Sequence, residues 1–346
     1  MSKTKKATLI FTAIIILACI GLMGYKAIDP VYTLPEPWLG KGISRLNGTN
    51  PGGRLVWSPN GKYLAGVKSK FPLPDCPGPI IFCVFSKEPY SEIFIVDLSK
   101  MERKTVGRSK EFEKYSGPIS WFPDGEHIAY IGRGTGSEWG IRSIDLNGKN
   151  DVQFISESGY PLWHPSISLI ALQSTVDAPN SWFPVIYLLD LSTKKKELIF
   201  QGKDPGTSIQ SLSWSADGKI LAFTYGNLWG NGSIRTNVYF YYLETKKLVQ
   251  FTDDKFEYWS AYFSPVNNII VLERYTPNVT YYYQRNFIVR DLNNNCDEEL
   301  PIRYVDSASW SPDGQQLLIS AEEGVYIVDM AKYFGSKFTE IGSVCP

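Results

Sequence analysis

The stretch Ser309-Trp310-Ser311-Pro312-Asp313-Gly314 (SWSPDG) decides the fold, because variants of it occur five more times along the chain. The other copies are Val56–Gly61 (VWSPNG), Ser120–Gly125 (SWFPDG), Leu162–Ser166 (LWHPS), Ser213–Gly218 (SWSADG) and Tyr262–Val266 (YFSPV). Their aromatic residues stand 42 to 64 residues apart, which is the scale of a propeller blade. The repeat therefore predicts six similar structural units.

The residue types of the repeat predict a tight hairpin between the first two strands of each unit. Proline presets φ, aspartate bonds nearby backbone amides, and glycine accepts a positive φ. The Trp or Phe before the turn is expected to pack between neighbouring units rather than to hold a ligand. The motif therefore predicts how the chain folds rather than where it binds a ligand.

Apolar segments after each turn complete a four-stranded unit. A second strand such as Tyr63–Val67 is followed by a third that ends in Asp-Leu, such as Ile93–Leu98, and by an outer strand such as Lys247–Phe251. One such sheet cannot bury both of its faces, so the units must stack in a ring. We predict an all-β, six-bladed β-propeller of four-stranded antiparallel blades over residues 42–346. Either Ile43–Leu46 or Phe338–Ile341 supplies the outer strand of the sixth blade.

The repeats resemble those of TolB-type propellers, which also occur in the propeller domains of prolyl-oligopeptidase-like peptidases. The resemblance covers roughly residues 42–342 and implies the fold rather than a particular activity. No G-x-S-x-G sequence is present, so the peptidase domain of those relatives is missing. The third and fifth copies lack Asp-Gly and the fourth has Ala216 in place of proline, so those turns are expected to be less regular.

The N-terminal segment predicts attachment to a membrane. Residues 1–6 are a basic tail, residues 7–25 are apolar, and residues 26–41 form a linker. A spanning helix with its N-terminus in the cytoplasm is the leading interpretation. Cys19 follows a sequence similar to a lipobox, so lipidation there is an alternative, and a cleaved signal peptide is another. Each interpretation places the propeller outside the cytoplasm, in the periplasm or at the cell surface.

Four further cysteines fit an oxidising compartment. We expect Cys76 to pair with Cys83 within one loop, and Cys296 to pair with Cys345 near the end of the chain. Four free buried thiols are the alternative. No C-x-x-C pair is present and neither histidine lies close in sequence, which disfavours a zinc site.

Charge and motifs exclude several functions. The chain has 35 basic and 35 acidic residues, so no global field attracts nucleic acid. His127 and His164 are its two histidines, and both are expected to be structural. We predict no catalytic residue, metal site or cofactor, although a pair of carboxylates near the ring axis stays open as a glycosidase-like or lyase-like arrangement.

Aromatic and arginine residues between the second and third strands predict a surface that binds a protein partner. This composition is typical of interface hot spots. Folding back of the aromatics to cap the propeller is the alternative. The expected function is a membrane-anchored scaffold or accessory subunit of a membrane complex. Binding of a small ligand or glycan in the central funnel is second, and a hydrolase or lyase is third. The candidate residues are Phe71, Trp139, Trp182, Phe183, Trp229, Tyr275, Tyr282, Arg133, Arg235 and Arg274.

Overall fold

The computed structural model describes residues 42–46, 54–70, 90–109, 116–133, 139–157, 159–178, 181–227, 235–275, 285–303, 305–321, 324–335 and 338. All of them lie in one of the two compact units of the chain, Glu36–Pro346. The predicted anchor at residues 7–25 lies outside the described residues. Among the described residues, no helix has the length and apolar character needed to cross a membrane.

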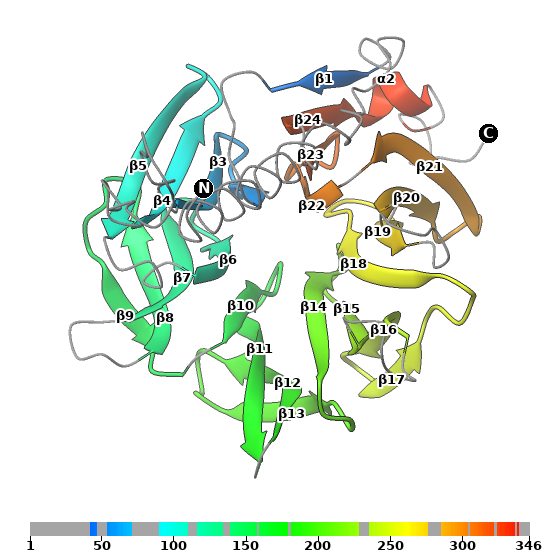
Figure 1. Ribbon diagram of the computed structural model, residues 1–346, viewed down its shortest axis with the longest axis horizontal. Coiled ribbons are helices and arrows are strands. Elements are labelled where there is room, and N and C mark those ends of the chain that lie inside the picture. Colours follow the sequence, from blue (N-terminus) through cyan, green and yellow to red (C-terminus); the bar gives the residue numbers. More distant parts are fainter. Residues whose placement is uncertain are drawn as a thin grey trace, which may run out of the picture. The chain divides into compact units, whose positions relative to one another are not determined.

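Six four-stranded antiparallel sheets are arranged in a ring, which confirms the predicted propeller (Figure 1). In blades 1 to 5 the strands lie in chain order from the centre outward. Blade 1 comprises β2 (Leu55–Trp57), β3 (Tyr63–Lys70), β4 (Tyr90–Asp97) and β5 (Glu102–Ser109). Blade 2 comprises β6 (Ser116–Trp121), β7 (His127–Arg133), β8 (Trp139–Asp145) and β9 (Val152–Ile155). Blade 3 comprises β10 (Tyr160–Trp163), β11 (Leu169–Ala178), β12 (Ser181–Asp190) and β13 (Lys196–Gln201).

The second half of the chain repeats this arrangement. Blade 4 comprises β14 (Thr207–Trp214), β15 (Ile220–Asn227), β16 (Asn237–Tyr242) and β17 (Lys247–Gln250). Blade 5 comprises β18 (Glu257–Phe263), β19 (Ile269–Tyr275), β20 (Arg285–Asp291) and β21 (Cys296–Arg303). Blade 6 comprises β22 (Val305–Trp310), β23 (Gln316–Ala321), β24 (Gly324–Asp329) and, from the start of the chain, β1 (Ile43–Arg45).

The N-terminal segment, rather than Phe338–Ile341, closes the ring. Strand β1 pairs antiparallel with β24, with Ile43 opposite Val328. Ile43 is 2% exposed, and Leu46 packs in a core cluster shared by blades 6 and 1. Asp329 caps the short helix α2 (Met330–Phe334) by accepting a hydrogen bond from the Lys332 backbone N–H at 3.0 Å. The chain therefore forms a short helix directly after β24, and Phe338 is the one residue of the competing segment that the structure describes.

The repeated turns have the expected geometry. Gly61, Gly125, Gly218 and Gly314 have φ between 65° and 70°, a region that favours glycine. In blade 4, Ser215 Oγ donates to the Asp217 carboxylate at 2.7 Å and accepts from the Ile220 backbone N–H at 3.0 Å. The same pair of bonds occurs around Ser58 in blade 1 and Ser311 in blade 6.

The aromatic residue of the repeat packs between blades, as predicted. Trp121 and Trp214 belong to core clusters that each combine two neighbouring blades. Trp121 Nε1 donates to the Val56 carbonyl of blade 1 at 3.2 Å, and Trp310 Nε1 donates to the Tyr262 carbonyl of blade 5 at 3.1 Å. In Trp121 and Trp310 the indole thus combines apolar burial with one hydrogen bond across the blade interface, whereas the buried Nε1 atoms of Trp57 and Trp214 have no partner among the described residues.

Candidate functional site

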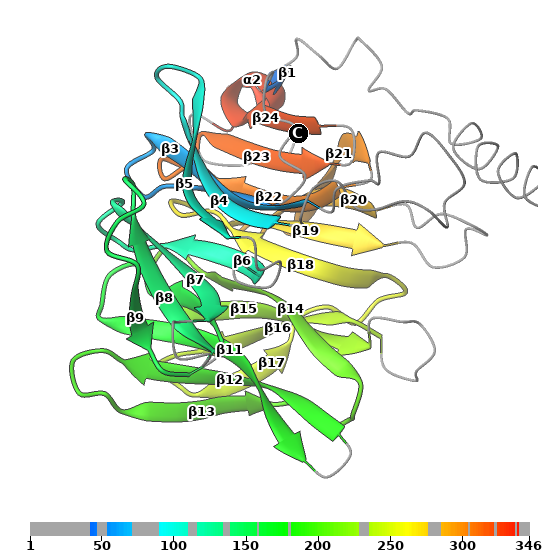
Figure 2. The same cartoon turned by 60° about the vertical axis from the view of Figure 1, so that its left-hand side comes forward.

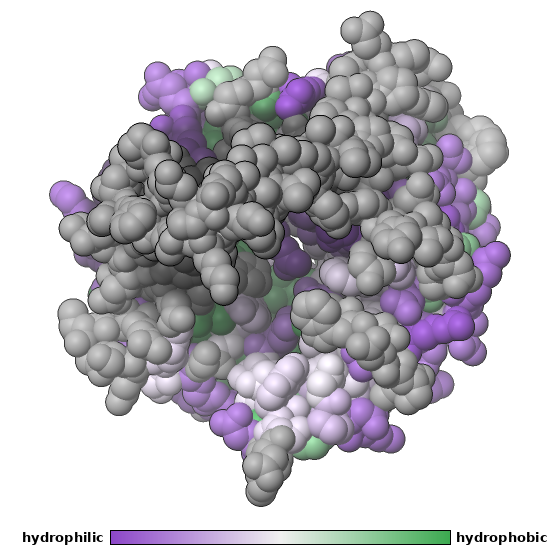
Figure 3. All heavy atoms as spheres, in the orientation of Figure 1, coloured by the Kyte–Doolittle hydropathy of each residue, from purple (hydrophilic) through white to green (hydrophobic). Residues whose placement is uncertain are grey.

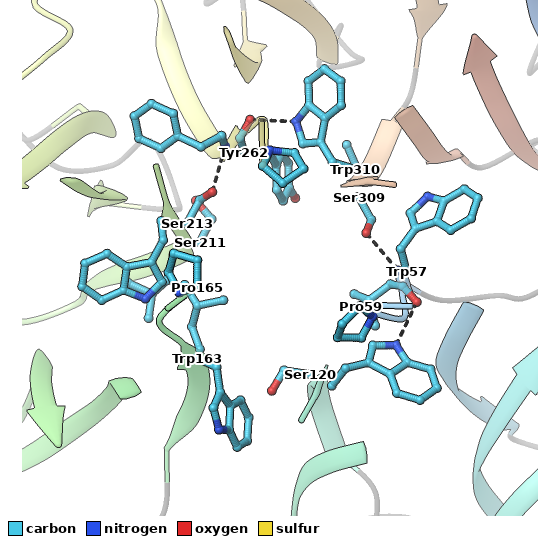
Figure 4. Close-up of a pocket in the computed structure, with 18 of the residues that line it drawn as sticks. Trp57, Pro59, Ser120, Trp163, Pro165, Ser211, Ser213, Tyr262, Ser309 and Trp310 are labelled. Atoms are coloured by element: carbon cyan, nitrogen blue, oxygen red, sulfur yellow. Dashed lines mark hydrogen bonds between the residues drawn. The ribbon is translucent and has the colours of Figure 1, made fainter. Parts of the chain in front are cut away.

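A channel of about 570 Å³ lies at the centre of the ring. Its wall is built by the innermost strands and the repeated turns of the six blades, and Figure 4 shows these side chains around it. In the view of Figure 3, hydrophilic and hydrophobic residues lie side by side in the central hollow. The volume falls in the range of ordinary small-molecule sites, about 300–1,000 Å³.

Serine hydroxyl groups form the polar part of the channel wall. Ser213 Oγ accepts a bond from the Phe263 backbone N–H at 2.8 Å, and Ser309 Oγ accepts one from the Trp57 N–H at 3.0 Å. Each bond joins one inner strand to the next blade. The Oγ atoms of Ser120 and Ser307 are buried and have no hydrogen-bond partner among the described residues. The serine before the repeat tryptophan therefore faces the axis.

Arg54 is the one charged residue among the described residues that line the channel. His164 also lines it, in a neutral form that is described below. Burial raises the pKa of Tyr160 on blade 3 and of Tyr262 on blade 5, and the positive charge of Arg54 opposes the shift at both. Arg54 itself belongs to blade 1, immediately before β2. Its guanidinium group therefore acts across the axis on two other blades.

A buried carboxyl group lies in the blade behind the channel wall. Glu273 on β19 is 3% exposed, accepts a bond from Ser260 Oγ, and pairs with Arg285 at 3.5 Å. Arg285 also contacts Asp306 at 3.6 Å. Burial raises the pKa of Glu273, although Ser260, Arg285 and Arg54 oppose this shift.

His164 has a structural role, as predicted. Its Nδ1 accepts the Ser166 backbone N–H at 3.1 Å, so Nε2 carries the proton that it donates to the Gly218 carbonyl at 3.1 Å. Burial lowers the pKa of His164, which favours this neutral form. The histidine replaces the turn serine of blade 3 and connects this turn to the turn of blade 4. His127 contacts Asp124 at 2.8 Å within its own turn.

The predicted partner-binding residues that are described lie on strands rather than in loops, except for Arg235, which precedes β16. Trp139 begins β8, Trp182 and Phe183 lie in β12, and Tyr275 ends β19. The reason is that the hairpins extend further than the sequence suggested: β11 runs to Ala178 and β12 begins at Ser181 (Figure 2). Since every one of these residues lies near the junction of the second and third strands of its blade, the topology brings them to one face of the ring.

These residues differ in their availability to a partner. Trp182 is 43% exposed. Arg235 is exposed, and its Nη1 donates to the Asp254 carbonyl at 3.4 Å. Arg274 is engaged within blade 5, because it pairs with Glu299 at 3.1 Å and lies 4.1 Å from the centre of the Phe256 ring. Of Arg133, the backbone alone is described, at the end of β7.

One of the four cysteines predicted to form disulfides is described. Cys296, the first residue of β21, takes part in a disulfide, but the pairing stays a prediction because no other cysteine is described. Within the described part of the chain, no cluster of three or more His, Cys, Asp or Glu could hold a metal ion. The predicted site residues that lie outside the described residues are Cys19, Phe71, Cys76, Cys83, Trp229, Tyr282 and Cys345.

Sequence reasoning missed Arg54 and the channel serines. Ser120, Ser213 and Ser309 were visible as the residue before the repeat tryptophan, and their alternation with a buried indole is the signal that places them on the opposite face of the strand. Arg54 has no such repeat position. Arg54 lines the central channel because closure of the six-bladed ring brings the start of β2 next to the inner strands of the other blades.

Solved structures share this architecture. A TolB-type protein of Agrobacterium tumefaciens is 16% identical with a TM-score of 0.55, over 80% of this chain and 89% of that one. TolB of Acinetobacter baumannii is 22% identical with a TM-score of 0.50, and this chain covers 59% of its length. This chain is a six-bladed propeller similar in fold to the TolB propellers.

The likeness of this TolB-like propeller to other proteins extends across several activities. An oligogalacturonate lyase of Vibrio parahaemolyticus is 11% identical with a TM-score of 0.53, over 83% of this chain and 93% of that one. No protein-family model and no curated protein matches the sequence. At these identities the likeness shows the fold and leaves the activity to be argued from the site.

Proposed function

We propose that this TolB-like propeller is a membrane-anchored, extracytoplasmic scaffold that binds another protein, as an accessory subunit of a membrane complex. The observation that carries the proposal is the β11–β12 hairpin, whose two ten-residue strands present Trp182 with 43% of its surface exposed. Tryptophan is among the residues most enriched in interface hot spots.

The surroundings of Trp182 support a partner-binding face. Topology brings Phe183 and Arg235 to the same end of the ring, on blades 3 and 4. A large aromatic side chain with a cation nearby suits a protein surface that offers a pocket and an acidic rim. The predicted anchor at residues 7–25 would hold this face outside the cytoplasm.

Photo-cross-linking in native membranes tests the proposal. A photoreactive phenylalanine at position 182 is expected to yield one discrete adduct of defined stoichiometry, which mass spectrometry identifies. Position 248 is the matched control, because Leu248 on β17 is also an exposed apolar residue, at 40%, and lies on an outer strand. Equal adducts from both positions, or none from 182 together with a chain purified alone from mild detergent, would contradict partner binding through this face.

Binding of a small ligand or glycan in the central channel is the second candidate. The specific observation in its favour is a channel of about 570 Å³ whose wall combines apolar side chains with the exposed, charged side chain of Arg54. Small-molecule sites typically have this mixture of apolar surface and a few placed polar groups. The same purified chain tests both candidates, since the cross-link reports on the hairpin and a direct binding measurement reports on the channel.

A further inference from the structure

We propose that the central channel binds an anionic small molecule with an apolar or ring-shaped body, and that Arg54 pairs with its negative group. This inference rests on the second proposed function and adds the chemical class of the ligand. It concerns a site different from the Trp182 face.

The first argument is the charge in the channel wall. Arg54 is exposed and makes no hydrogen bond or ion pair with any other described residue. Its charge reaches Tyr160 on blade 3 and Tyr262 on blade 5, which places it toward the axis. Its charge also reaches the Glu273 carboxyl group behind the wall, which already pairs with Arg285 at 3.5 Å. Among the described residues of the wall itself there is no Asp or Glu. A cation in a narrow, partly apolar space attracts an anion more strongly than it would in open solvent.

The second argument is an excess of hydrogen-bond donors. Ser213 and Ser309 each use their oxygen to accept a backbone N–H, so their hydroxyl hydrogens stay available. Carboxylate and phosphate oxygens accept several bonds at once, so an anion satisfies more of these donors than a neutral molecule does.

The third argument is the apolar remainder of the wall. The half-buried aliphatic side chains of Leu162 and Leu212 line the channel, and the prolines of the repeated turns lie around it (Figure 4). A purely inorganic ion would leave this surface against water. An organic acid covers it while its charged end meets Arg54.

Calorimetric titration of the full-length chain in mild detergent tests the inference with matched probes. Benzoate and glucuronate are compared with their neutral amides, benzamide and glucuronamide, and inorganic phosphate distinguishes a carboxylate from a phosphate ligand. We expect at least one organic anion to bind in the millimolar range or tighter. Its affinity should exceed that of its amide by roughly 10- to 150-fold, the effect of one charge-assisted hydrogen bond.

Variants locate the effect. Arg54→Gln should weaken binding of the anion by a similar factor and leave that of the amide unchanged, whereas Arg54→Lys should retain much of the affinity. Arg108→Gln is the control, because Arg108 is also exposed but lies on β5, the outer strand of blade 1, away from the channel wall. Loss of binding with rising salt should accompany the effect.

Three results would overturn the inference or part of it, and they are distinguishable. Equal binding of acids and amides, unchanged in Arg54→Gln, would remove the anionic class but keep the channel as a ligand site. Failure of every probe, charged or neutral, would remove the channel site itself and leave the Trp182 proposal to its own cross-linking test. Preferential binding of phosphate over both carboxylates would refute the organic body.

Discussion

The turn of blade 4 packs against the His164 ring so closely that one methyl group at Gly218 is expected to destabilise the propeller. A Cβ built at Gly218 would lie 2.3 Å from ring atoms of His164. His164 is 6% exposed and its ring centre lies 4.8 Å from that of Trp214, so it has little room to move. Gly61→Ala is the matched control: Gly61 has the same φ of 70° in the same kind of turn, but its Cβ would meet its nearest atom, on Pro312, at 3.9 Å.

Both substitutions place an alanine at positive φ, which costs about 1–2 kcal/mol. Gly218→Ala adds the cost of overpacking, about 1–3 kcal/mol, and strains the bond from His164 to the Gly218 carbonyl. At roughly 2 °C per kcal/mol for a domain of this size, Gly218→Ala should melt about 2–6 °C below Gly61→Ala. Differential scanning fluorimetry of the two purified variants measures this difference.

The double variant His164→Ser with Gly218→Ala separates crowding from backbone strain. Serine is the residue at this turn position in blades 1, 4, 5 and 6, and it would clear the space beside Gly218. Gly218→Ala should then cost no more in the His164→Ser background than Gly61→Ala costs in the parent chain. An equal melting temperature for the two glycine variants, or an unchanged cost after His164→Ser, would refute the proposed contact between turns.

Three further changes test other parts of the structure. Ser309→Ala should cost about 1 kcal/mol in the free energy of unfolding because the Trp57 N–H loses its acceptor. Ser120→Ala should stay within about 0.5 kcal/mol because its hydroxyl has no partner among the described residues. Urea denaturation compares the two variants, and a reversed order would contradict the assignment. Ile43→Ala should cost about 2–5 kcal/mol by the same measurement, because Ile43 is 2% exposed in the strand that closes the ring. Ser44→Ala, at the exposed neighbouring position, should be near neutral. Similar costs for the two variants would refute closure by β1. Glu273→Gln should stabilise the protein more at pH 8 than at pH 5, because burial raises the pKa of Glu273 in the folded state above its unfolded value of about 4.3. The stability that protonation of Glu273 contributes is complete below the unfolded value and is lost as pH rises through the folded pKa. Melting curves that show a benefit independent of pH would contradict this.

Local sequence signals were sufficient for the blades because each blade repeats the same short-range physics. The turn serine, proline, aspartate and glycine interact within six residues, and the strands that follow alternate inward and outward positions. The closing strand was harder to assign. Ile43–Leu46 and Phe338–Ile341 have similar apolar patterns, and the choice depends on Asp329, which caps a helix and so directs the chain away from the sheet.

The site could be predicted less well than the fold, since its geometry depends on contacts between blades. His164 deviates from the repeat, and its bond to Gly218 becomes visible once blades 3 and 4 stand side by side. Arg54 precedes an ordinary strand, and its position near Tyr160 and Tyr262 results from closure of the whole ring. The long β11–β12 hairpin was mistaken for a loop because Trp182 and Phe183 precede Pro184, a residue that usually interrupts strands.

The pairing of β1 with β24 also has a consequence for the order in which the protein folds. Residues 43–45 leave the ribosome, or the export channel, well before residues 324–329, and no nearer strand takes their place in the sheet of blade 6. Blades 1 to 5 consist of contiguous segments, so each can form as it emerges, while Ile43 stays without its partner until Val328 appears. The last step of folding is therefore a contact of very high sequence separation, which is slow and leaves an exposed strand edge in the meantime. A chaperone would be needed most during that interval.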